Sequence, residues 1–202
     1  MDSLTQEKIH LDLGCGKLPK NPYNADIVFG TDIFDAEISQ SDLDYKFIFN
    51  KVNLNGESLP YEDNFFDSVS AFDLIEHIPR QLHTEDKGFY SPFINLMNEI
   101  YRTLKQGGKF LALTPAYPNS AAFSDPTHVN FITTETHKYF TDENPFSEIY
   151  GFKGNFKLIR ANWDVVANYR TQQSYQKRIM RRLHRRFFKG GLKHFLWEFE
   201  KR

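Results

Sequence analysis

The residues with the clearest chemical meaning lie near the start of the chain, in the stretch HLDLGCGKLPKNP (residues 10–22). A short apolar run ends there in Gly14 and Gly16, and glycine has no Cβ to keep a ligand away from the backbone N–H groups of a turn. A phosphate loop would need a hydroxyl residue after its lysine, which GCGKLP lacks. A dinucleotide turn would need a third glycine at Pro19 and a helix start, which Pro19 and Pro22 disfavour. The turn therefore suits a ligand without a pyrophosphate.

An acid follows the second apolar run of the chain. The stretch IVFGTDI (residues 27–33) places Asp32 twenty residues after Asp12. A carboxylate at such a strand end can accept hydrogen bonds from both hydroxyls of a ribose. Together, the glycine turn and Asp32 predict a ligand that contains a nucleoside and a small charged group.

These residues need a sheet to position them, and the apolar pattern predicts one. Predicted strands cover residues 9–13, 27–33, 47–52, 66–72 and 110–113, and residues 156–166 predict one or two closing strands. Residues 92–104 predict an amphipathic helix, with Gly107 as its stop. The alternation predicts an α/β fold whose parallel sheet is covered on both faces and binds ligands at the carboxyl ends of its strands.

At these residues the sequence resembles the class I S-adenosylmethionine-dependent methyltransferases, in which (D/E)xGxG follows the first strand and an acid ends the second. Three further stretches resemble motifs of the type-11 branch in the same order: LPYEDNFFDSV (59–69), LIEHI (74–78) and NLMNEIYRTLKQGGKF (95–110). The resemblance covers residues 8–168. It implies a Rossmann-like fold with a mostly parallel seven-stranded sheet, and S-adenosylmethionine as the cofactor.

The resemblance also assigns the cofactor-binding residues. It implies that Asp12, Gly14, Cys15 and Gly16 line the methionine end and that Asp32 holds the ribose. Asn53, with Leu54 beside it, stands where many members read the adenine amino group, and Phe72 and Asp73 would lie below the transferable methyl. The link from residue 17 to residue 26 is short and contains prolines, which puts the usual first helix in question but not the glycine turn.

The candidate catalytic residues lie after the fourth and fifth predicted strands. Methyl transfer from a sulfonium needs an aligned acceptor and, for a hydroxyl acceptor, a base that removes its proton, a task that suits histidine. His77 follows the fourth strand, and His128 lies in the long loop after the fifth. The run SDPTHVNF (124–131) resembles the DPTHVRFF of methyltransferases in bacterial surface-polysaccharide and small-molecule pathways, which implies that His128 and Asp125 face the acceptor. We therefore expect methyl transfer to a hydroxyl of a small polar acceptor, such as a sugar or glycan precursor.

Several alternatives stay open from the sequence. One is an N-methyltransferase acting on a small amine, and another is a non-catalytic methyltransferase-like partner subunit. His77 and Asp125 could serve only in turns, and Glu76 could anchor loop backbone. We predict no metal site, although Asp125, His128, His77 and Glu76 could compose a divalent one. Cys15 is expected to be an apolar spacer in the turn. The other five histidines are expected at the surface: His10, His83, His137, His184 and His194.

The charge of the chain divides near residue 169. Residues 1–169 hold 14 Lys and Arg against 24 Asp and Glu, whereas residues 170–202 hold 11 against 2. We predict a methyltransferase domain over 1–169 and a basic helical tail over 170–202, with amphipathic helices at 175–188 and 192–199. Such a tail suits an anionic membrane surface. The alternative is that its apolar stripe packs on this domain or on a partner subunit; nucleic acid is disfavoured because no RNA- or DNA-binding module accompanies the charge.

The location expected from the sequence is cytoplasmic, with the inner face of the membrane as a peripheral site. The single cysteine excludes an intrachain disulfide and fits a reducing compartment. The polar start of the chain does not resemble a signal peptide, and no apolar stretch reaches the length of a membrane span.

Overall fold

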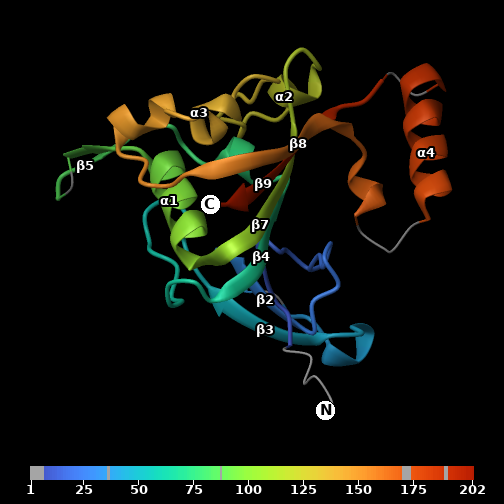
Figure 1. Ribbon diagram of the computed structural model, residues 1–202, viewed down its shortest axis with the longest axis horizontal. Coiled ribbons are helices and arrows are strands. Elements are labelled where there is room, and N and C mark those ends of the chain that lie inside the picture. Colours follow the sequence, from blue (N-terminus) through green and yellow to red (C-terminus); the bar gives the residue numbers. More distant parts are fainter. Residues whose placement is uncertain (1–6, 36, 87, 170–173, 189–190) are drawn as a thin grey trace.

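One seven-stranded sheet dominates the computed structural model, which describes residues 7–35, 37–86, 88–169, 174–188 and 191–202 (Figure 1). Its spatial order is β3 (Lys46–Lys51), β2 (Ile27–Asp32), β1 (Ile9–Leu13), β4 (Phe66–Phe72), β7 (Leu104–Pro115), β9 (His194–Lys201) and β8 (Phe156–Asp164). The first five strands pair in parallel, and β9 is antiparallel to both of its neighbours. The predicted α/β fold with a mostly parallel sheet is confirmed. The strand order reverses between β1 and β4, which is where such sheets bind ligands.

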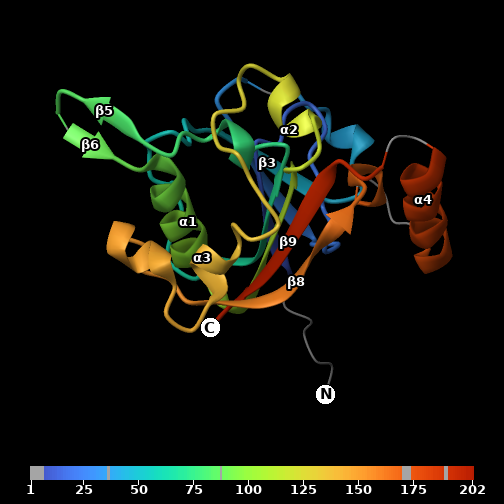
Figure 2. The same cartoon turned by 90° about the horizontal axis from the view of Figure 1, so that it is seen from above.

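The remaining elements surround this sheet. The helices are α1 (Pro92–Thr103), α2 (Ala121–Ser124), α3 (Lys138–Thr141) and α4 (Tyr175–Phe188), and the 3₁₀ turns are η1 (Gln40–Asp42), η2 (Ile75–His77), η3 (Phe146–Tyr150) and η4 (Val166–Asn168). Strands β5 (Leu82–Thr84) and β6 (Gly88–Tyr90) form a separate hairpin. Figure 2 shows α1 and α3 on one side of the sheet and α4 on the other. Between β1 and β2, residues 14–26 form turns and no helix.

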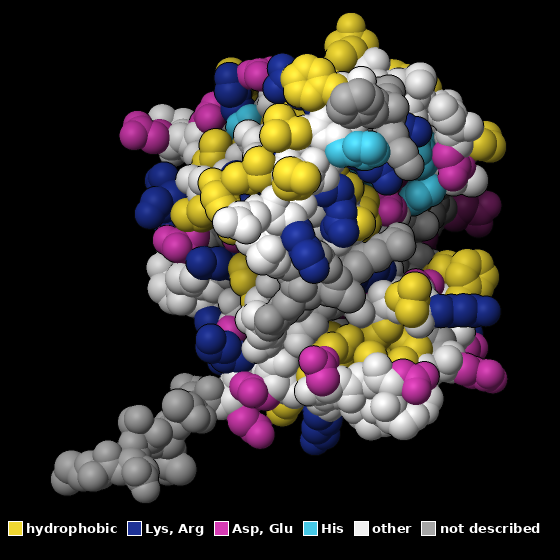
Figure 3. Space-filling model, turned by 90° about the vertical axis from the view of Figure 1, so that its right-hand side faces the viewer, with side chains coloured by type: hydrophobic (Ala, Val, Ile, Leu, Met, Phe, Trp, Pro, Cys, Tyr) yellow, Lys and Arg dark blue, Asp and Glu magenta, His cyan; other side chains and the backbone are white. Residues whose placement is uncertain are grey.

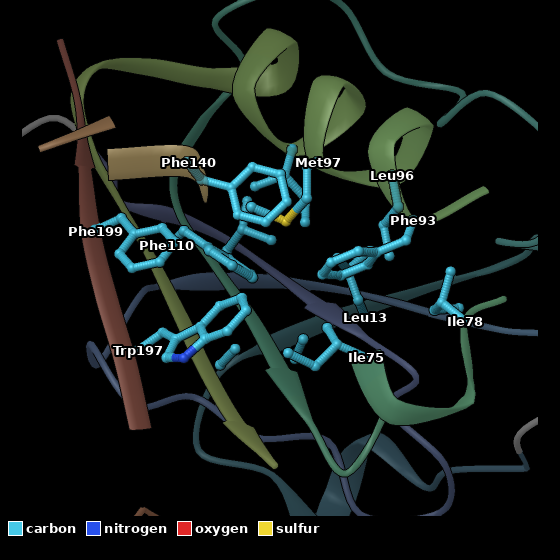
Figure 4. Close-up of a cluster of buried hydrophobic side chains, with 14 of the residues drawn as sticks. Leu13, Ile75, Ile78, Phe93, Leu96, Met97, Phe110, Phe140, Trp197 and Phe199 are labelled. Carbon is cyan, nitrogen blue, oxygen red and sulfur yellow. The ribbon is translucent and has the colours of Figure 1, made fainter. Parts of the chain in front are cut away.

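Alternation along β1 separates the core from the site. Leu11 and Leu13 are fully buried in the main hydrophobic cluster, which also receives Met97 and Ile100 from α1 (Figure 4). His10 and Asp12 point to the opposite face, because successive side chains of a strand alternate. The strand thus delivers Asp12 to the edge where the glycine turn begins.

Helix α1 ends earlier than predicted. It stops at Thr103, and β7 begins at the next residue, so Gly107 is not the helix stop. Leu104 pairs with Phe66 and Lys109 with Ser68, and the pairing register shifts between them. Gly107 has a φ of 73°, so its left-handed backbone supports this irregularity inside the strand.

The predicted helix over 192–199 is wrong, because these residues belong largely to β9. Phe195, Trp197 and Phe199 join the main cluster on one face of the sheet, and Leu196 joins a smaller cluster on the other. A strand buried on both faces reads as a continuous apolar run, which is easily mistaken for a helix. Within the predicted tail, α4 over 175–188 is confirmed as a helix. The predicted tail, residues 170–202, therefore contributes one strand to the sheet, and the boundary predicted after residue 169 does not separate the tail from the sheet.

Candidate active site

The glycine turn after β1 packs against the segment that follows β4. Gly14 and Gly16 have φ values of 63° and 55°, which L residues rarely adopt. A Cβ on Gly14 would lie 2.9 Å from Cδ1 of Leu74, whereas a Cβ on Gly16 would meet open space. Gly14 is therefore required by packing, and Gly16 leaves room beside the turn.

Asp32 closes the turn from the end of β2. Its Oδ2 accepts a hydrogen bond from the backbone N–H of Gly16 at 3.0 Å, and its Oδ1 accepts one from Phe34 at 3.1 Å. The carboxylate is half-buried. Since each carboxylate oxygen can accept more than one hydrogen bond, Asp32 retains capacity for ligand hydroxyls.

Asp12 lies in a buried hydrogen-bonded chain below the turn. Its Oδ2 accepts from the backbone N–H of Lys20 and its Oδ1 from the hydroxyl of Ser70, both at 2.8 Å. His10 lies 2.9 Å from the Ser70 hydroxyl and is fully buried, so its expected surface position is wrong. Burial raises the pKa of Asp12 to about 6 and lowers the pKa of His10 to about 3. Asp12 thus fixes the loop after the turn to β4.

The other predicted cofactor residues have unequal surroundings. Cys15 is buried, and burial raises the pKa of its thiol to about 12, which agrees with a spacer role. Leu54 is part of the main cluster. Asn53 is exposed, and its Oδ1 already accepts a hydrogen bond from the backbone of Asn55 at 3.1 Å. Phe72 is buried on the face of the sheet opposite α1.

Asp73 adopts a strained backbone and has a partner that the sequence did not indicate. Its φ is 49°, and its Oδ1 lies 2.9 Å from Nε2 of His194, the first residue of β9. Non-glycine residues with positive φ cluster at functional sites. His194 was expected at the surface; only the pairing of β9 with β7 brings it to Asp73.

A second group of side chains gathers where η2 meets the long loop after β7. The backbone oxygen of Glu76 accepts hydrogen bonds from the N–H groups of Val129 and Asn130, both at 2.9 Å. Arg80 donates to the Asn130 side chain at 2.7 Å. These bonds hold His128 beside His77, and Arg80 and Asn130 are positioning residues that sequence reasoning missed.

The two histidine rings lie edge to face, with centroids 4.8 Å apart. Nδ1 of His128 lies 3.1 Å from the carbonyl oxygen of Ala122, and Nδ1 of His77 lies 3.3 Å from that of Thr127. A carbonyl oxygen only accepts, so each Nδ1 carries the proton and each Nε2 presents a lone pair. The side chain of His128 is only 7% exposed. It lines an open hollow of about 470 Å³ together with Ser120, Ala121, Ser124, Asp125, Pro126 and Lys193.

The two acids near these rings differ in their surroundings. Asp125 is exposed; its Oδ1 accepts hydrogen bonds from the N–H and the hydroxyl of Thr127, which lower its pKa, and its Oδ2 lies 4.0 Å from Nε2 of His128. Glu76 is buried, and burial raises its pKa to about 7. Its Oε2 accepts from the Thr114 hydroxyl at 2.7 Å, whereas its Oε1 is buried without a hydrogen-bond partner among the described residues.

A comparison with protein families decides the class of this site. The model of a methyltransferase domain, type 11, matches residues 11–112, which is half of the chain. The chain belongs to this family of class I S-adenosylmethionine-dependent methyltransferases. The matched residues include the glycine turn, Asp32 and η2, and S-adenosylmethionine is the cofactor.

Solved structures agree with the methyltransferase fold. YcgJ from Bacillus subtilis is 18% identical with a TM-score of 0.54, over 97% of this chain and 92% of its own. An S-adenosylmethionine-dependent methyltransferase from Archaeoglobus fulgidus is 16% identical, with a TM-score of 0.53 and coverages of 97% and 87%. A geranyl diphosphate methyltransferase in complex with S-adenosylmethionine is 12% identical, with a TM-score of 0.51 and coverages of 97% and 79%. A search of curated protein sequences found no match.

The residues of this methyltransferase fit its cofactor. The space beside Gly16, the acid at the end of β2 and the helix-free link over 14–26 suit a nucleoside with a methionine tail. A pyrophosphate would instead favour a helix N-terminus at the turn. Among the described helices, none combines the length and the apolar character that a membrane span requires.

Proposed function

We propose that this methyltransferase transfers the methyl group of S-adenosylmethionine to a hydroxyl oxygen of a small polar acceptor, with a sugar or glycan precursor as the favoured class. The observation that carries the proposal is the pair of histidines, of which His128 lines an open hollow, each with Nδ1 held as a donor and Nε2 free. A neutral imidazole in this tautomer can accept a proton from a hydroxyl that binds in the hollow.

The reaction needs one proton acceptor and one displacement. The acceptor oxygen forms a bond to the methyl carbon as the carbon–sulfur bond breaks, and the hydroxyl proton goes to Nε2 of His128. Asp125, with Oδ2 4.0 Å from that nitrogen, stabilises the imidazolium that results. His77 is the second candidate base, and Thr127 orients it through the contact with Nδ1 at 3.0 Å.

The polar lining of the hollow supports a sugar-like acceptor. Ser120, Ser124, Asp125 and Lys193 offer hydroxyl, carboxylate and ammonium groups around His128. These groups can hydrogen-bond to the hydroxyls of a sugar, whereas an apolar acceptor would make no such bonds. Asp12, Gly14, Gly16 and Asp32 are proposed to hold the cofactor, and Phe72 and Asp73 to lie near its methyl.

The test is a methyl-transfer assay with His128→Ala. We expect turnover with a responsive hydroxyl acceptor, drawn from a panel of nucleotide sugars and polyols, to fall by about 10²-fold or more. His83→Ala is the matched control, because His83 is an exposed histidine on the β5–β6 hairpin. An unchanged rate in His128→Ala would remove this residue from the mechanism. Methylation of amines alone would favour the N-methyltransferase alternative.

A further inference from the structure

Three metal-ligating side chains meet at the acceptor side of the site. Ligand atoms of Glu76, His77 and His128 all lie within 4.8 Å of one another. They come from two segments, η2 and the loop after β7, which the hydrogen bonds from Val129 and Asn130 to the Glu76 backbone hold together. Asp125, which the sequence allowed as a fourth ligand, is not part of this cluster.

The rings are held in the form that a metal requires. Metal-bound histidines usually donate their other ring N–H to a carbonyl or carboxylate, which fixes the tautomer. Here, His128 donates from Nδ1 to Ala122, and His77 donates from Nδ1 toward Thr127. The Thr127 hydroxyl in turn donates to Asp125 at 2.6 Å. Both Nε2 atoms are therefore left as ligands.

The two carboxylate oxygens of Glu76 differ in their hydrogen bonds. Its Oε1 is buried without a hydrogen-bond donor among the described residues, although Oε2 is bonded to Thr114. A buried polar atom without a partner costs roughly 1–3 kcal/mol, which an ion or a water molecule bound to it would offset. A bound cation would satisfy this oxygen.

We propose that Glu76, His77 and His128 bind one divalent first-row transition-metal ion. Two imidazoles and a carboxylate prefer ions such as Zn²⁺, Co²⁺ or Mn²⁺ to Mg²⁺. Ligands at about 2.1 Å from a tetrahedral ion lie about 3.5 Å apart, so the three side chains must draw together slightly. Of the three ligands, His128 also lines the 470 Å³ hollow.

The ion would sit beside the proposed acceptor position, so the inference rests on the proposed function for the acceptor class and gives His128 the role of a ligand in place of the role of a base. A metal ion lowers the pKa of a hydroxyl that it coordinates. It would also compete with the proton for Nε2 of His128, so at this atom the metal and the general base are alternatives. Assays with and without a chelator distinguish them.

Binding is tested directly on the full chain, stripped of metal by a chelator. We expect calorimetry with Zn²⁺ to give one ion per chain, and Co²⁺ to develop visible ligand-field bands. His77→Ala, His128→Ala and Glu76→Gln should each weaken binding by at least about tenfold, whereas His83→Ala should leave it unchanged. Circular dichroism would verify that each variant folds, and half-buried His77 gives the variant least disturbing to the core.

Failure to bind either ion would overturn the metal site, and so would an affinity in His77→Ala and His128→Ala that equals the affinity of the unmodified chain. Because these titrations contain no cofactor and no acceptor, they do not depend on the proposed reaction. A chain that binds the ion but methylates no hydroxyl would refute the proposed function and leave the metal site intact.

Helix α4 carries a second, independent inference, because arginines of its basic side contact the body, whereas its apolar side stays largely exposed. Ile179 and Leu183 line an open hollow between the helix and the body, together with Trp163. The guanidinium of Arg178 lies 4.9 Å from the ring centre of Tyr169, and Arg182 pairs with the buried carboxylate of Asp164. Arg181 donates to the backbone of Ala167 at 2.8 Å. The sequence-based alternative placed the arginines in solvent, and for these three arginines that part of it is wrong.

The apolar face of α4 is left open to solvent. Exposed fractions are 77% for Tyr175, 70% for Met180, 49% for Leu183 and 69% for Phe187. The helix holds no acid, and the three cations that remain besides those bound to the body are Lys177, Arg185 and Arg186. Figure 3 shows hydrophobic side chains flanked by Lys and Arg on this side of the molecule. An exposed apolar face with cationic flanks complements the surface of an anionic bilayer.

We infer that α4 binds an anionic lipid surface through this face. In vesicle flotation, the full chain should bind vesicles that contain phosphatidylglycerol and not vesicles of phosphatidylcholine alone. Met180→Ser with Phe187→Ser should reduce binding by at least about tenfold. Phe89→Ser is the control, since Phe89 is equally exposed at 76% on β6.

Absence of flotation with anionic vesicles would overturn this inference. Sedimentation that shows a dimer, dissociated by the Met180 and Phe187 substitutions, would assign the same face to a second copy of the chain instead.

Discussion

The two sides of the active site differ in how their polar groups are used. On the cofactor side, Asp12 and Asp32 are bonded to backbone N–H groups of the glycine turn and its loop. On the acceptor side, Oε1 of Glu76 and the Nε2 atoms of His77 and His128 have no hydrogen-bond partner in the described part of the chain. The cofactor side therefore has its shape before any ligand binds, whereas the acceptor side keeps groups free for a proton or an ion.

The largest expected effect concerns the free-energy cost of ionising the buried carboxyl group of Glu76. Burial raises the pKa of Glu76 from 4.5 to about 7. The folded state thus binds the proton more tightly than the unfolded state, and the contribution of Glu76 to stability is lost as pH rises from about 4.5 through about 7. This loss amounts to about 3 kcal/mol of unfolding free energy by pH 8.

Glu76→Gln should remove that dependence, since glutamine does not titrate and can still accept from Thr114. Urea unfolding of metal-free protein at about pH 5 and pH 8 would measure it, with Glu148→Gln on the exposed surface as the control. If the unfolding free energies of Glu76→Gln and of the wild type depend on pH in the same way, ionisation of Glu76 does not destabilise the folded state.

The next effect concerns the cofactor side. Asp32→Ala should weaken S-adenosylmethionine binding by about 2 kcal/mol, or roughly 30-fold, because hydrogen bonds to a charged group are lost. Asp35→Ala is a suitable control, since Asp35 is exposed and pairs only with exposed Lys51 among the described residues. Calorimetry would measure both variants. Equal losses in the two, or tight NAD binding by the wild type, would contradict the assignment of Asp32 to the ribose.

The smallest effect isolates packing from backbone strain in the glycine turn. Gly14 and Gly107 both have positive φ, but only at Gly14 would a Cβ approach another side chain closely, at 2.9 Å from Leu74. Gly107→Ala should cost about 1 kcal/mol of unfolding free energy from strain alone. Gly14→Ala should cost about 1 kcal/mol more, because Leu74 must move. Identical losses would mean that the turn does not need its close contact with the β4 segment.

The sequence predicted a region well where that region is formed by residues close to one another in the chain. The strands around the glycine turn, and helix α1, have strong periodic patterns, and their boundaries agree with the structure within a few residues. Asp32 was predictable because its bond to Gly16 joins consecutive strands of one βαβ-like unit. The role of Gly107 was predicted wrongly because glycine can stop a helix or support a strand irregularity equally well.

Several contacts of the site join segments that are far apart in the sequence. Such contacts are difficult to predict from a single sequence. His194 meets Asp73 only because β9 is a central strand, and β9 had been predicted as a helix. Burial of His10 likewise requires Ser68 and Ser70 of β4, almost sixty residues away. His77 and His128 were predicted individually, but their approach depends on the backbone of Glu76.

The measurement that tests the central claim most directly is a crystal structure of the chain with S-adenosylhomocysteine. We expect the ribose hydroxyls to contact Asp32 and the sulfur to face the hollow lined by His128, next to His77. A ribose bound away from Asp32, or a sulfur that faces away from both histidines, would contradict the claim that the two sides form one methyl-transfer site.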